Sequence, residues 1–167
     1  MRPTTINITD PKGGQSVAFA GGSYRVLISG EQTNNAFGVI DMLVPPHAGP
    51  TPHSHASIQE SFYVVEGELT FRTETQTYVA RKGAFIEIPL GGTIHNFQNE
   101  TDTLAHVVCT VAPAGMEKMF LELGVPVEAG ELRPMTPPTP EELKHIMEVA
   151  AKYGQELLPS DYFQKRG

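Results

Sequence analysis

Three histidines and one glutamate carry the chemistry that this sequence offers most clearly. His53 and His55 are separated by a single residue, Glu60 follows them closely, and His95 lies further along the chain. Because side chains alternate along an extended strand, His53 and His55 should point the same way, about 7 Å apart. Two imidazoles on one face, directed into a barrel, can share a metal ion.

Glu60 is expected to join them, because it begins an apolar run in which a solvated residue is hard to justify. Phe62 and Val64 share its side of the strand, so its carboxylate should face the interior, where an unpaired charge is costly and a metal removes that cost. His95 can complete the set from another strand. The alternative is a group of satisfied polar residues in a barrel that has lost its metal.

This donor set suits one divalent transition metal, namely Fe, Mn, Ni, Co, Cu or Zn, and does not suit Ca or Mg. Four protein ligands on an octahedral ion would leave two positions open for water, dioxygen or a bidentate substrate. A closed structural zinc site would more often use cysteine. The one cysteine, Cys109, lies in an apolar run and is expected to be a small buried hydrophobe.

Short strands must position these residues. The chain has 167 residues, enough for one domain, and its 16 glycines and 14 prolines favour an all-β chain with many turns. Runs of β-branched and aromatic residues alternate with turn signals, a pattern typical of a sandwich or barrel. The pattern predicts strands near 17–19 and at 24–29, 36–44, 60–66, 69–73, 77–80, 84–88, 95–99 and 104–112.

The pattern changes to a helical one after residue 112. A first helix should end near Gly124, since apolar residues before it recur at helical spacing. A second helix should begin at a capping box formed by Thr139 and Glu142, with Pro140 at its first position, and end at Gly154. We expect both helices outside the barrel or across a dimer interface. The predicted division is an arm at 1–22, a barrel at 23–112 and a helical extension at 113–167.

Composition argues against several classes of partner. The net charge is −7 and no stretch gathers lysine and arginine, so neither nucleic acid nor an anionic membrane is expected. The first ten residues lack the apolar stretch of a signal peptide, and no apolar run approaches the roughly 20 residues that cross a bilayer. The default expectation is a cytoplasmic protein.

Two motifs resemble those of the cupin superfamily. H53-S-H55-x4-E60-x6-G67 resembles the first cupin motif, and G83-x5-P89…H95-x3-N99 resembles the second. The resemblance implies an all-β fold, a small jelly-roll barrel (double-stranded β-helix), with a metal near its centre held by His53, His55, Glu60 and His95. The stretch from Pro89 to His95 has one residue more than the motif usually has, and either Gly91 or Gly92 could be the motif glycine.

The chain is also similar to the single-domain quercetin-dioxygenase-like cupins. That similarity implies a metal-dependent dioxygenase acting on a flavonol-like or other enolisable aromatic substrate, with Glu60 as a ligand that also takes the substrate proton. A homodimer, formed through the N-terminal arm and the outer face of the sheet, is a further expectation from the family. The residues expected to line the substrate pocket are Phe62, Phe97, Phe37 and His106.

Plain core packing is the alternative for the three phenylalanines, and a satisfied core position is the alternative for His106. Two other functions also stay open, since cupins with this ligand set include several activities. One is an isomerase or lyase acting on a small keto or sugar acid, which would need a cation in the pocket; the arginines to check are Arg25, Arg72 and Arg81. The other is a non-catalytic barrel that binds a small molecule.

Overall fold

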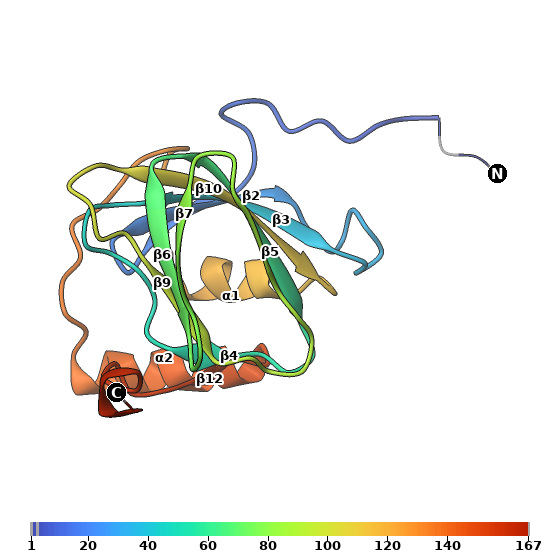
Figure 1. Ribbon diagram of the computed structural model, residues 1–167. Helices are drawn as coiled ribbons and strands as arrows, with labels where there is room; N and C mark the ends of the chain where they lie inside the picture. Colours follow the sequence, from blue (N-terminus) through green and yellow to red (C-terminus); the bar gives the residue numbers. More distant parts are fainter. Residues whose placement is uncertain (1, 3, 167) are drawn as a thin grey trace.

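Two antiparallel sheets face each other and form a small jelly-roll barrel, which confirms the predicted fold (Figure 1). The computed structural model describes residue 2 and residues 4–166. The larger sheet has the strand order β11-β1-β2-β3-β10-β5-β8, and the smaller sheet has the order β12-β4-β9-β6-β7. Strands distant in sequence are therefore neighbours, as the predicted metal site requires.

The strands lie close to the predicted ranges, and two of the three two-residue strands were not predicted. The larger sheet contains β1 (Ser16–Phe19), β2 (Gly22–Ile28), β3 (Gly38–Val44), β5 (Gln59–Glu66), β8 (Phe85–Ile88), β10 (Ala105–Ala112) and β11 (Val125–Pro126). The smaller sheet contains β4 (His53–Ser54), β6 (Glu68–Thr73), β7 (Thr77–Arg81), β9 (His95–Gln98) and β12 (Glu156–Leu157). The unpredicted strands are β11 and β12, which are too short to show an alternating pattern; β4 lies in the segment expected to be extended, although His55 follows its end.

Alternation along the central strands builds the core. In β3 and β10 every second residue is buried, and the residues between them lie on the outer face of the sheet. The inward side chains of the two strands pack together between the sheets. Those inward residues include Ile40, Met42, Val44, Val107, Cys109 and Val111.

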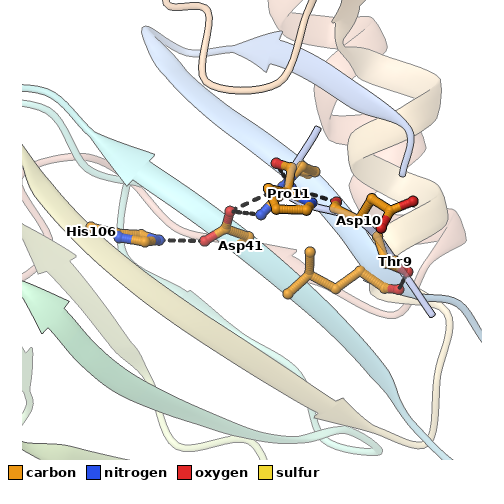
Figure 2. A network of polar contacts seen from close by, with 7 residues as sticks. Thr9, Asp10, Pro11, Asp41 and His106 are labelled. Carbon is orange, nitrogen blue, oxygen red and sulfur yellow. Dashed lines mark hydrogen bonds and ion pairs between the residues drawn. The ribbon is translucent and has the colours of Figure 1, made fainter. Parts of the chain in front are cut away.

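The outer face carries a polar network centred on Asp41 in β3. Arg25 donates to Asp41 Oδ2 from Nε at 3.0 Å and from Nη2 at 2.7 Å, and His106 contacts Asp41 Oδ1. Arg25 also donates to the backbone of Asp10 and Pro11, which ties the N-terminal arm to the sheet (Figure 2). His106 therefore lies outside the barrel with its side chain 33% exposed, and the prediction that it lines the pocket is wrong.

Two helices follow the barrel, α1 (Met116–Leu123) and α2 (Pro140–Lys152), with a short 3-10 turn at Gln164–Arg166. The capping box is confirmed: Thr139 Oγ1 accepts from the Glu142 backbone at 3.2 Å, and the Thr139 backbone donates to Glu142 Oε2 at 2.7 Å. Helix α1 packs on β1, β3 and α2. None of the helices in the described part of the chain is long and apolar enough to cross a membrane.

The C-terminal segment returns to the barrel after α2. Strand β12 pairs with β4, with Leu157 opposite His53 and Glu156 opposite Ser54. Helix α2 consequently lies across the end of the barrel where β4 and β12 meet (Figure 1). The extension covers one end of the barrel, a position more specific than the predicted placement on its outside.

Candidate metal centre

The structure brings His53, His55, Glu60 and His95 together inside the barrel. His53 in β4 and His95 in β9 are register partners in the smaller sheet, and His55 follows β4 directly. Glu60 extends from β5 in the facing sheet. One ligand atom from each residue lies within 4.8 Å of the others, and all four side chains are buried.

Backbone carbonyls fix the orientation of all three imidazole rings. The Nδ1 atom of each ring lies within hydrogen-bond distance of a carbonyl oxygen, and because a carbonyl can only accept, Nδ1 must carry the proton. Nε2 of each neutral ring is then unprotonated and available as a ligand. The carbonyls belong to Thr51 for His53 (2.9 Å), Ile58 for His55 (2.8 Å) and Thr93 for His95 (2.8 Å).

The centre of the cluster needs a cation. Glu60 Oε2 lies 3.0 Å from His55 Nε2 and 3.3 Å from His95 Nε2. With Nδ1 protonated, these contacts would join lone pair to lone pair unless a proton or a metal lies between them. Three imidazole nitrogens and one carboxylate oxygen are a donor set that transition metals favour. The residues present therefore fit a metal ion.

The electrostatics agree with this arrangement. Burial, followed by the neighbouring His95, lowers the pKa of His53 to about 4, so its imidazole is neutral at physiological pH. Burial would raise the pKa of Glu60, but its close contacts with the His55 and His95 rings outweigh burial, and the pKa is lowered. Burial likewise opposes a charge on His55, yet the contact with Glu60 raises its pKa overall. The carboxylate thus stays anionic and attracts a cation.

The extra residue before His95 is absorbed by a turn. Gly91 and Gly92 both have positive φ, 113° and 83°, a conformation that glycine adopts without strain. The Gly91 backbone donates to the Ala56 carbonyl at 3.0 Å, which holds this turn against the loop that follows His55. The longer turn leaves His95 in register with His53.

An apolar cavity of about 340 Å³ opens onto His53 and Glu60. It extends from the barrel interior to the two helices, and none of its lining residues is lysine or arginine. Tyr24 is one of these residues, and burial raises its pKa to about 12, so its phenol is neutral. The apolar lining includes Phe19, Met42, Phe97, Met116, Met119, Phe120, Leu123, Leu143, Ile146 and Leu157.

Comparison with known proteins identifies the barrel. A family model described as Cupin domain matches residues 40–111, the range that contains all four residues of the cluster. KdgF from Halomonas sp. superposes with a TM-score of 0.59 over 69% of this chain and 99% of that one, at 16% identity. A predicted oxalate decarboxylase from Thermotoga maritima superposes with a TM-score of 0.56 over 65% of this chain and 99% of that one, at 19% identity. Residues 40–111 match the cupin domain, and the barrel has the cupin fold.

A third similar protein is the quercetin 2,3-dioxygenase of Bacillus subtilis (strain 168), which is 27% identical over 114 residues. The match covers 68% of this chain and 33% of that protein, so the chain spans about a third of the relative's length. KdgF and the predicted oxalate decarboxylase are less similar in sequence, and their similarity supports the fold alone.

The cupin motifs place their polar residues in two different roles. Asn99, which ends the second motif, does not face the cavity with His95. Its amide donates to the Val44 and Thr103 carbonyls at 2.9 and 2.7 Å, so it holds a turn. His47, in the loop before the first motif, is on the surface, with its side chain 68% exposed and next to Asp102.

Of the three phenylalanines expected in the pocket, only Phe97 lines the cavity. Phe62 is 1% exposed and packs against Phe71 and Phe97 at 5.2 and 5.4 Å between ring centroids, so it belongs to the core. Phe37 is 38% exposed just before β3 and contributes nothing to the cavity wall. The structure corrects the prediction for these two residues, because neither position faces the space between the helices and the metal centre.

Cys109 has a contact that its apolar neighbours in sequence gave no reason to expect. It is fully buried, as predicted, and its thiol donates to Glu60 Oε1 at 3.2 Å. Burial, followed by the charge of Glu60, raises the pKa of Cys109 well above its usual value, so the sulfur keeps its proton. The thiol therefore holds one carboxylate oxygen while the other faces the histidines.

Replacing Cys109 by valine should lower the affinity for a divalent transition metal by about 10-fold, because partners that orient a ligand typically contribute 10- to 100-fold. Cys109→Ser, which keeps a donor, should stay within a few-fold of the parent protein. Competition with a chromogenic chelator measures both affinities. Equal affinities for the valine and serine variants would show that the thiol only fills space.

Proposed function

We propose that this protein is a metal-dependent dioxygenase acting on a flavonol-like or other enolisable aromatic substrate. One observation carries the proposal: a buried cluster of three histidines and a glutamate opens onto an apolar cavity with no cationic lining residue. A cavity of about 340 Å³ falls within the usual range for small-molecule sites. The similarity to quercetin 2,3-dioxygenase over 114 residues supports the reaction class.

The residues of the cluster would have two roles, metal binding and proton acceptance. His53, His55 and His95 would hold the ion through Nε2, and Glu60 would hold it through Oε2. A bound metal would polarise the substrate oxygen that coordinates it and favour the enolate. Glu60, as the anionic ligand of the cluster, would then accept the hydroxyl proton of the substrate. Phe97 and the methionines of the cavity wall exclude water from the reacting group.

The alternative of a sugar-acid or keto-acid isomerase has less support. Such a substrate needs a cation in the pocket, and the three arginines to check are all engaged elsewhere. Arg25 binds Asp41, Arg72 binds Glu100 and Arg81 binds Glu68. None of the three lines the cavity. An uncharged substrate fits an apolar wall better than a carboxylate does.

Dioxygen consumption tests the proposal. Protein loaded separately with iron, manganese, nickel, cobalt or copper is supplied with 3-hydroxyflavone, and oxygen uptake is followed with an electrode. We expect uptake with at least one metal, and none with flavone, which lacks the hydroxyl that would bind the metal. Absence of uptake with every metal, for flavonols and for diketones, would end the dioxygenase proposal.

A further inference from the structure

Gln155 is fixed at the wall of the cavity by the elements on both sides of it. Helix α2 ends at Lys152, and Gly154, with φ of 79°, turns the chain back toward the barrel. The Gln155 backbone donates to the Ala150 carbonyl at 2.9 Å, and the next residue begins β12, which pairs with β4. The position of Gln155 is therefore set by the helix end and by the strand that carries His53.

The side-chain amide of Gln155 has no hydrogen-bond partner among the described residues, although the residue is only 9% exposed. It lines the same cavity as His53 and Glu60. The amide is not among the fully enclosed atoms without a partner, so it has access to the space of the cavity. Polar groups away from bulk solvent are nearly always paired. An unpaired amide at the wall of a ligand cavity suggests that its partner is the ligand.

The chemistry of the cavity restricts that ligand. An amide offers a donor and an acceptor but no charge, so it matches a hydroxyl or a carbonyl. The other walls are largely apolar, and no lysine or arginine is present to balance a carboxylate or a phosphate. A neutral molecule with an apolar body and two separate polar groups fits these walls.

Resting on the proposed function, we propose that Gln155 orients the substrate by hydrogen-bonding a second polar group, remote from the oxygen that binds the metal. The preferred substrates are then uncharged aromatic molecules with one hydroxyl at the metal and another toward the C-terminal extension. Gln155 lies outside residues 40–111, so this selectivity belongs to the extension and not to the matched cupin domain.

Ligand binding without turnover tests the assignment. Protein loaded with zinc, which has no redox chemistry, is titrated under nitrogen with quercetin and with 3-hydroxyflavone, which carries only the metal-binding hydroxyl. We expect Gln155→Met to weaken quercetin binding by about 3- to 10-fold, the effect of one hydrogen bond, and to weaken 3-hydroxyflavone binding much less. The ratio of the two dissociation constants is the readout.

Matched variants separate recognition from a general disturbance. Gln76→Met makes the same change at an exposed turn residue outside the cavity wall and should leave the ratio unchanged. Gln155→Leu provides a second apolar replacement if the methionine variant melts at a lower temperature than the parent protein. An unchanged ratio in a folded Gln155 variant would overturn the assignment, and so would failure of the parent protein to bind either flavonol.

The two proposals fail in different ways. A shifted ratio without dioxygen uptake by any metal form would retain Gln155 as a recognition residue and reject the dioxygenase. Dioxygen uptake with an unchanged ratio would retain the dioxygenase and reject the role of Gln155.

Discussion

His95→Ala should lower the affinity for divalent transition metals by more than about 100-fold and abolish dioxygen uptake. Loss of a residue that merely orients a ligand already costs about 10- to 100-fold, so loss of a ligand should cost more. His95 is buried, its Nδ1 is held by Thr93, and its Nε2 faces Glu60 at 3.3 Å. Metal content after dialysis and chelator competition measure the effect.

His47→Ala is the matched control for that experiment. His47 is an exposed histidine whose side chain contacts Asp102, away from the cluster, so its loss should change neither metal content nor uptake. A His95→Ala protein that keeps a full equivalent of metal with parental affinity would contradict the assignment of the cluster. The melting temperature of the metal-free forms shows whether both variants fold.

Glu60→Gln should reduce dioxygen uptake by about 10²- to 10⁴-fold at saturating metal, the usual contribution of a positioned base. The amide has nearly the shape of the carboxylate, but it has no charge and cannot take the substrate proton. Its effect should fall mainly on kcat, because the apolar wall that binds the substrate is unchanged. The metal affinity should fall as well, since an anionic ligand is lost.

Glu66→Gln removes a carboxylate from the exposed end of the same strand, where Glu66 pairs with Lys82, and should leave kcat unchanged. Assays of both variants at matched metal occupancy separate loss of the base from loss of the ion. A Glu60→Gln enzyme that retains a tenth or more of the parental kcat would show that another group accepts the proton.

The sequence by itself indicated the short strands and the four candidate ligands, and the resemblance to the cupin motifs predicted that these ligands meet in one barrel. The single residue between His53 and His55 predicts that both rings point the same way. The apolar Phe62 and Val64 indicate which side of β5 faces the interior. The capping box at Thr139 could also be predicted from the sequence, because its hydrogen bonds join residues three positions apart. Each of these features follows from the period of a strand or a helix.

Only the tertiary structure decided which side of β10 faces the core. Val107, Cys109 and Val111 lie on one side of that strand, and His106, Val108 and Thr110 lie on the other, so both sides carry valine. Asp41 on the neighbouring strand holds His106 outside, and Glu60 on the other neighbour meets Cys109 inside. Alternation separates two faces, but pairing with distant strands selects the buried one.

The same reason applies to the C-terminal extension. Glu117 looks like a solvated helix residue, yet it is fully buried and accepts from the Gly30 backbone at 2.9 Å. Gln155 follows a helix-ending glycine, a position that gives no hint of a cavity. Contacts between residues far apart in sequence produce no periodic pattern of residue types. The cavity wall formed by α2 and the segment around β12 could therefore not be predicted from the sequence.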